Sequence, residues 1–230
     1  LSFVHSYIIE DKKDGLIVID TGFPNAERST NILVDAIRLA GYDPKDVKHI
    51  LITHGHPDHI GNVHALQQFS GAAIWMNTKD ASYLKDASNG YPAVYKKDGS
   101  LYTGMPPSYS AQVQHEFNEG DTLPLAGGIK VIATPGHSLG HVSFLLKRHS
   151  GIIFMGDALT NVNGQFDLPP NFVDVAKEVQ SIDNLLAENF DKIAFGHGNY
   201  ISSNGKKLLQ NFAERISYDD VKSEFGIPTK

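Results

Sequence analysis

The run ILITHGHPDH at residues 50–59 is the most informative part of the chain, because a short apolar strand leads directly into three histidines and an aspartate. We predict a buried strand over His49–Thr53, which places the side chains that follow it at the carboxyl end of a sheet, where α/β folds build their sites. Neutral imidazole and carboxylate ligands favour zinc, iron or manganese over calcium. The run therefore predicts a metal site at the end of a strand.

Three isolated residues repeat this pattern further along the chain. His137 follows the predicted strand Ile129–Ala133, Asp157 follows Ile152–Gly156, and His197 follows Lys192–Phe195. Four predicted strands thus each end on a candidate metal ligand, and a chance arrangement of polar loops does not explain so regular a placement.

The remaining elements indicate two sheets covered by helices, because strands come mostly in pairs and helices return between the groups. The other predicted strands are Phe3–Ile9, Leu16–Asp20, Ala73–Met76 and Ser143–Lys147. The predicted helices are Asn25–Ala40, Ile60–Phe69, Thr78–Lys85, Val173–Glu188 and Gly205–Tyr218. We expect a single domain over residues 1–230.

A tyrosine-rich insertion at about 77–118 has the weakest pattern. We predict the short helix Thr78–Lys85 and then a loop that carries Tyr91, Tyr95, Tyr102 and Tyr109. Loops of this length are usually functional or mobile. We therefore expect the insertion to cap the active site, with packing of a long loop as the alternative.

Composition narrows the possible partners. The 230 residues carry a formal net charge of −6, which argues against dedicated binding to nucleic acid or an anionic membrane. No stretch approaches the roughly 20 apolar residues of a membrane span. The chain has no cysteine, which excludes disulfides and thiolate ligands and fits a cytoplasmic protein. We expect a small-molecule substrate and make no prediction of the oligomeric state.

The motif His-x-His-x-Asp-His at residues 54–59 is followed in order by Thr-Pro-Gly-His, Gly-Asp and Gly-His. Together with the early Asp20-Thr21-Gly22, this order resembles the metallo-β-lactamase superfamily over nearly the whole chain. The resemblance implies an α+β four-layer αββα sandwich with the site at one edge. It assigns one metal site to His54, His56 and His137, a second to Asp58, His59 and His197, and the bridge between them to Asp157.

The resemblance also implies a chemistry. Two divalent ions, zinc first with iron or manganese as alternatives, would generate a bridging hydroxide and polarise a substrate carbonyl. Asp58 is the candidate catalytic residue. Asp20 and His141 are expected to orient the ligands, and Thr53 and Ser138 to hydrogen-bond them.

The bridging Gly156-Asp157 favours the branch that resembles glyoxalase II and the acyl-homoserine lactonases over true β-lactamases, and hence hydrolysis of a small ester, thioester or lactone. Ala158-Leu159-Thr160 lacks the tyrosine typical of the lactonases, and the tail Phe212–Lys230 lacks the basic motif of glyoxalase II, so the substrate stays open. The alternatives are amide hydrolysis of the β-lactamase type and an oxidoreductase similar to the mono-iron persulfide dioxygenases.

Overall fold

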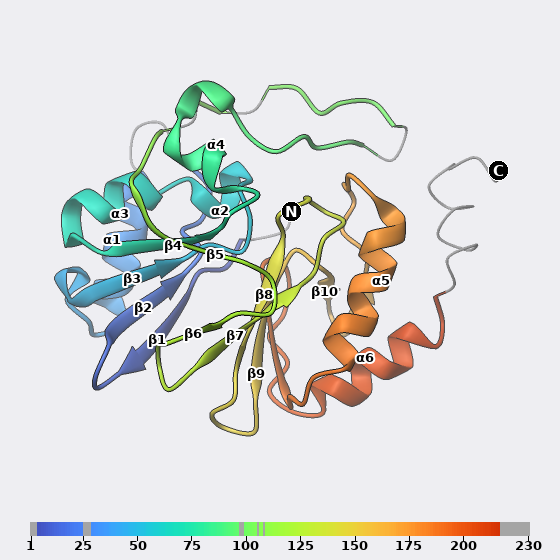
Figure 1. The fold of residues 1–230 in the computed structure, drawn as a ribbon. Helices are drawn as coiled ribbons and strands as arrows, with labels where there is room; N and C mark the ends of the chain where they lie inside the picture. The colour runs from blue at the N-terminus through green and yellow to red at the C-terminus, as the bar shows by residue number, and fades with distance from the viewer. Residues whose placement is uncertain (1–3, 25–28, 97–98, 105, 108, 217–230) are drawn as a thin grey trace.

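Two five-stranded sheets lie face to face, and helices cover the outer side of each (Figure 1). The computed structural model describes residues 4–24, 29–96, 99–104, 106–107 and 109–216, and the side chains of 29–32 are not described. This arrangement is the predicted four-layer αββα sandwich.

The first sheet is mostly parallel. Its order is β1 (Tyr7–Asp11), β2 (Gly15–Ile19), β3 (Val47–Leu51), β4 (Ala73–Asn77) and β5 (Val113–Phe117). β1 and β2 form an antiparallel hairpin, whereas β2 to β5 pair in parallel. The carboxyl ends of β2 and β3 therefore meet at the same edge.

The second sheet mixes both directions. Its order is β12 (Lys192–Phe195), β9 (Ile152–Gly156), β8 (Val142–Leu146), β7 (Ile129–Ala133) and β6 (Thr122–Leu123). β7 and β9 both run antiparallel to β8, and β12 runs parallel to β9. Hence β7, β9 and β12 all end at one edge. A separate hairpin consists of β10 (Thr160–Val162) and β11 (Gln165–Asp167).

The helices complete the outer layers. α1 (Ser29–Leu39) and α3 (Val63–Ser70) pack on the first sheet, and α5 (Val175–Leu186) and α6 (Gly205–Ala213) on the second (Figure 1). Asp174 caps α5 by accepting from the backbone N–H of Lys177 at 3.1 Å. The shorter pieces are α2 (Pro57–Ile60), α4 (Ala81–Lys85), and the 3₁₀ turns η1 (Pro44–Asp46) and η2 (Ala87–Asn89).

Alternation along the strands creates the layered core. On β2, Ile17 and Ile19 face the apolar cluster between the sheets, while Leu16 and Val18 face the cluster under the helices. Such strands are buried on both faces, so they appear in the sequence as continuous apolar runs.

The two sheets are joined where the strands end. The backbone N–H of Val142 donates to the carbonyl of Thr53 at 3.0 Å, and that of His5 donates to the carbonyl of Gly196 at 2.9 Å. Strand direction and these bonds bring the loops after β2, β3, β7, β9 and β12 to one place.

Two sequence predictions need correction. Val113–Phe117 is the edge strand β5 and not part of a loop, and the predicted helix Ile60–Phe69 is replaced by α2, which begins at Pro57, and α3. β5 escaped prediction because its middle residues are polar and exposed, and only Phe117 is buried. The predicted helix start at Asn25 and the predicted helix end at Tyr218 lie outside the described residues, and α6 already ends at Ala213. Within the described chain, no helix is both long and apolar enough to cross a membrane.

Candidate metal centre

All seven predicted ligands lie at this shared edge, in two clusters. The ligand atoms within each cluster lie within 4.8 Å of one another. The first cluster consists of His54, His56 and His137, and the second of Asp58, His59, Asp157 and His197.

The local backbone explains why residues so close in sequence reach two clusters. His56 is in an extended conformation directly before α2, and Pro57 takes the first helical position, where its fixed φ suits a helix start. Asp58 and His59 then lie in the helical turn, and the N–H of His59 bonds the carbonyl of His56 at 3.0 Å. The change from strand to helix divides the motif between the clusters.

The first cluster is buried and its imidazoles are neutral. The Nδ1–H of His54 donates to Thr53 Oγ1 at 3.0 Å, and that of His137 donates to the carbonyl of Asn171 at 2.7 Å, so each Nε2 keeps its lone pair. His56 Nδ1 lies 2.8 Å from His137 Nε2. Burial lowers the pKa of all three rings below the usual range.

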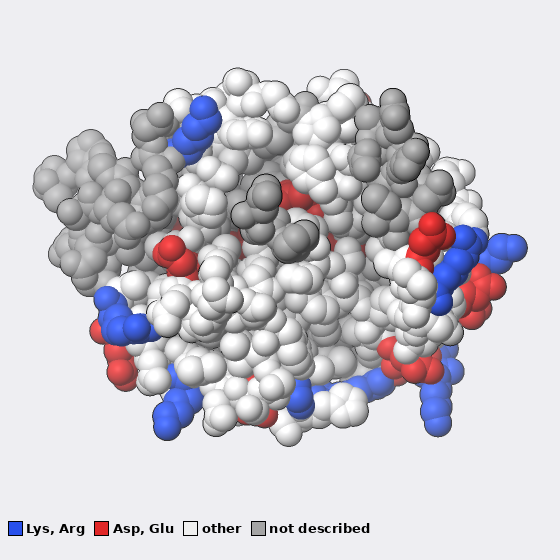
Figure 2. Space-filling model, turned by 180° about the vertical axis from the view of Figure 1, so that it is seen from behind, with Lys and Arg blue, Asp and Glu red and all other residues white. Residues whose placement is uncertain are grey.

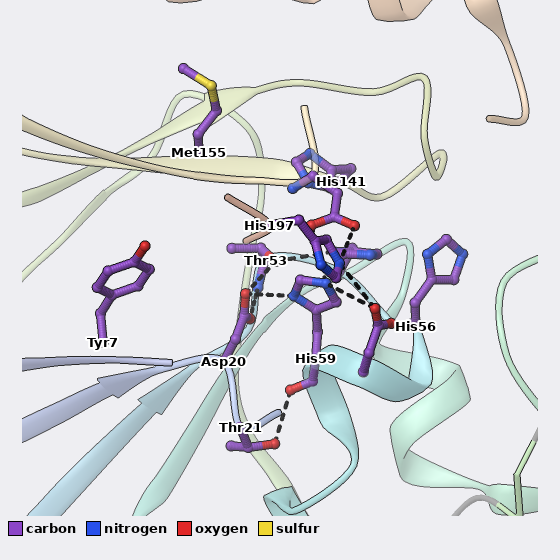
Figure 3. A network of polar contacts seen from close by, with 12 residues as sticks. Tyr7, Asp20, Thr21, Thr53, His56, His59, His141, Met155 and His197 are labelled. Atoms are coloured by element: carbon purple, nitrogen blue, oxygen red, sulfur yellow. Dashed lines mark hydrogen bonds and ion pairs between the residues drawn. The ribbon is translucent and has the colours of Figure 1, made fainter. Parts of the chain in front are cut away.

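The second cluster pairs histidines with carboxylates (Figure 3). His197 Nε2 lies 3.1 Å from Asp58 Oδ2, and His59 Nε2 lies 3.2 Å from Asp157 Oδ1. Burial alone would lower the pKa of both rings, but Asp157 and Asp58 raise that of His59 well above normal and that of His197 to about 10. The cluster therefore favours positive charge.

Asp157 faces both clusters. Its Oδ2 lies 3.2 Å from His197 Nε2 of the second cluster and 3.5 Å from His137 Nε2 of the first. Gly196 allows the carboxylate to sit there, because a Cβ at that position would lie 2.2 Å from Asp157 Oδ1.

Asp20 orients rings in both clusters. Its Oδ2 accepts from His59 Nδ1–H and from Thr53 Oγ1–H, both at 2.8 Å, and its Oδ1 accepts from the backbone N–H of Thr53 at 2.9 Å (Figure 3). Thr53 Oγ1 is then free to accept from His54, as predicted. Supporting bonds of this kind fix the tautomer and the direction of metal-binding rings.

His141 supports Asp157 through a hydrogen bond to its backbone. Its Nε2 accepts the backbone N–H of Asp157 at 2.9 Å, and its Nδ1 lies 3.0 Å from the carbonyl of Thr134. Burial lowers the pKa of His141 to about 3, so the ring is neutral, as an acceptor nitrogen requires.

The donor atoms fit two divalent cations. Among the described residues, the buried Nε2 atoms of His54 and His56 have no hydrogen-bond partner. Leaving a buried polar atom unpaired costs about 1–3 kcal/mol, and a cation would satisfy both. The nitrogen and oxygen donors suit zinc, iron or manganese.

A cavity of about 260 Å³ opens onto the clusters. Seen from behind, acidic side chains lie in a hollow whose surroundings are mostly uncharged (Figure 2). Val94 and Tyr102 of the insertion line the cavity, and Thr160 and Asn171 add polar groups. The remaining walls are largely apolar and include Phe23, Pro169 and Pro170.

The sequence did not reveal two residues that support the ligands, Asp80 and Asn171. The prediction that Ser138 hydrogen-bonds a ligand is wrong. Ser138 donates to Asp80 Oδ2 at 3.2 Å and not to a ligand. Asp80 has a weak signal, an aspartate shortly after a strand of the first sheet. Asn171 acts through its backbone carbonyl, which the side-chain pattern does not reveal.

The fold and the site define a sandwich protein with a paired His/Asp metal centre at one edge. A family model described as the metallo-beta-lactamase superfamily matches residues 1–197, and the chain belongs to that superfamily.

Curated relatives cover most of the chain. Hydroxyacylglutathione hydrolase GloC of Haemophilus influenzae is 30% identical over 90% of this chain and 91% of its own. The probable metallo-hydrolase YflN of Bacillus subtilis is 25% identical over 87% and 82%. Among solved structures, the subclass B3 metallo-beta-lactamase BJP-1 of Bradyrhizobium japonicum aligns with a TM-score of 0.71 and 23% identity, over 96% of this chain and 87% of its own. That likeness supports the fold alone.

Proposed function

We propose that this metal-dependent hydrolase uses two divalent ions to cleave a small ester, thioester or lactone. The position of Asp157 carries the proposal, because its Oδ2 lies within 3.5 Å of a histidine from each cluster. A carboxylate between two ligand sets is suited to hold two ions side by side.

Each set of ligands is assigned to its own ion. We assign one ion to His54, His56 and His137 and the other to Asp58, His59 and His197, with Asp157 shared. When bound, such ions lower the pKa of water toward neutrality and polarise a carbonyl group.

Asp58 is the more open carboxylate of the site. Its side chain is 23% exposed against 6% for Asp157, and it lines the cavity. Asp58 would therefore hold an ion with one carboxylate oxygen and leave the other to accept a proton from an attacking water.

Two observations support an ester or thioester bond. GloC, which resembles this chain over most of its length, is a hydroxyacylglutathione hydrolase by name, and its substrate class is a thioester. In the cavity, apolar walls such as Val94 and Tyr102 stand beside the polar metal ligands. That combination suits an acyl group next to a polarised carbonyl.

A substrate panel tests the proposal. Purified chain loaded with zinc, manganese or iron would be assayed on small esters, thioesters, lactones and β-lactams, with oxygen uptake on a persulfide as a parallel assay. The expected result is turnover of at least one ester, thioester or lactone that is abolished by a chelator and restored by metal. Turnover of β-lactams alone, or oxygen uptake by a one-iron form without hydrolysis, would refute it.

A further inference from the structure

We propose that Asp80 is a positioning residue that sets the geometry of the first metal site by holding the two loops that carry its ligands. The inference rests on the proposed metal-dependent function. Asp80 lies outside both ligand clusters. The structural argument for its role comes from its buried hydrogen bonds.

Asp80 has an unusual orientation for its position. It follows β4 and lies at the N-cap of α4, where an aspartate ordinarily accepts from the first turn of its helix. Within the described chain, the Asp80 side chain makes no such capping bond. It is buried, at 2% exposure, and points toward the metal-binding loops.

One oxygen of Asp80 contacts both loops. Asp80 Oδ2 accepts the backbone N–H of Gly55 at 2.9 Å and the hydroxyl of Ser138 at 3.2 Å. Gly55 lies between His54 and His56, and Ser138 follows His137. The carboxylate therefore joins the two segments that supply all ligands of the first cluster.

Gly140 approaches the other oxygen of the same carboxylate. A Cβ at Gly140 would lie 2.1 Å from Asp80 Oδ1, so the close approach requires glycine. The carboxylate presents a second oxygen to this backbone, where an amide would instead place either its single oxygen or its NH₂ group.

The second cluster is supported by other groups. Asp20 holds His59, and His141 holds the backbone of Asp157. Loss of the Asp80 carboxylate should therefore loosen the first site and spare the second. A general packing role would not produce this difference between sites.

Stepwise zinc affinity, measured by competition with a chromophoric chelator, tests the inference. Asp80→Asn should weaken the first site by about 10-fold, at the low end of the range for supporting residues. Ser138→Ala, which removes one donor, should act in the same direction and more weakly. Asp86→Asn is the matched control, because Asp86 lies at the other end of α4 and caps the exposed η2.

Two variants, each lacking one ligand of one cluster, show which metal site Asp80→Asn weakens. In a chain with His197→Ala, which weakens the second cluster, Asp80→Asn should weaken the remaining ion. In a chain with His54→Ala, it should leave the remaining ion unchanged.

Equal weakening in both backgrounds, or none in either, would overturn the positioning role. If Asp80→Asn does not fold, unchanged affinity in Ser138→Ala would overturn it as well. A wild-type chain that binds no zinc would refute the proposed function itself, so the two failures are distinguishable.

Discussion

At the scale of single residues, the site is defined as much by the groups behind the ligands as by the ligands. Asp20 fixes His59, the carbonyl of Asn171 fixes His137, and His141 fixes the backbone of Asp157. These bonds fix the directions of the donor atoms, which reduces the ordering that cation binding requires.

The support from His141 gives a prediction at this scale. His141→Ala removes the acceptor of the Asp157 N–H, so we expect turnover to fall by roughly 10–100-fold, with the protein still folded. His115→Ala is the matched control, since that ring is exposed and stacks on Trp75, 3.9 Å between centroids. Equal turnover in His141→Ala and the wild type would show that the bond has no such role.

The ligands could be predicted from the sequence because each lies within a few residues of the end of an apolar strand or belongs to the dense motif of residues 54–59. Asp80 could not, because its role depends on contacts with Gly55 and Ser138, which are distant in sequence. Local pattern reveals residues that share a strand end, whereas a buried bond between loops appears only in the folded chain.

At the scale of elements, the insertion contributes part of the cavity wall. A β-bridge pairs Tyr95 with Leu101, and the N–H of Tyr102 bonds the carbonyl of Val94 at 2.8 Å. This pairing brings Val94 and Tyr102 together, and both line the cavity. The prediction that the insertion caps the active site can therefore be tested at one side chain, through its effect on substrate choice.

We expect Tyr102→Ala to leave the metal content intact and to change relative turnover across a series of acyl esters of increasing size. The reason is that removing this ring enlarges the wall beside the metal centre. Tyr109→Ala is the control, because Tyr109 is exposed and contacts His64 instead of the cavity. If both variants show the wild-type order of substrates, Tyr102 does not set substrate choice.

The elements themselves were unequally predictable. Strands such as β7, β9 and β12 are buried and apolar, and their predicted bounds are confirmed. β5 consists of Val-Gln-His-Glu-Phe at the sheet edge, and pairing with β4 stabilises it without an apolar run. Polar edge strands depend on a partner strand, which the local sequence does not specify.

At the scale of the whole molecule, the sheets are also joined at the edge opposite the metal centre. Arg148, between β8 and β9, donates to Asp11 Oδ2 at the end of β1. The backbone N–H groups of Lys13 and Asp14 donate to Asp11 Oδ1, each at 2.9 Å. The bond from Arg148, followed by these backbone bonds, lowers the pKa of Asp11 to about 2.

This shift predicts a pH dependence of stability. The pKa of Asp11 is lower in the folded chain than the value of about 3.9 expected when unfolded, so the ionised carboxylate stabilises the fold above about pH 4. That contribution is lost as the pH falls from about 4 to about 2.

The urea concentration at the midpoint of unfolding should therefore differ most between the wild type and Asp11→Asn near neutral pH. This gap should shrink in acid. Asp35→Asn, at an exposed pair with Arg38 on α1, serves as the control. A gap for Asp11→Asn that stays constant down to about pH 3 would contradict the assigned shift.

The central claim is that two ligand clusters share Asp157 and hold two ions, and metal content of matched variants tests it most directly. Elemental analysis with chelator competition would compare the wild type, His197→Ala and Asp157→Ala. We predict two ions per wild-type chain, one tightly held ion in His197→Ala, and weakened binding of both ions in Asp157→Ala, because its carboxylate faces both clusters. A single ion in the wild type, or two ions at full affinity in either variant, would contradict the account.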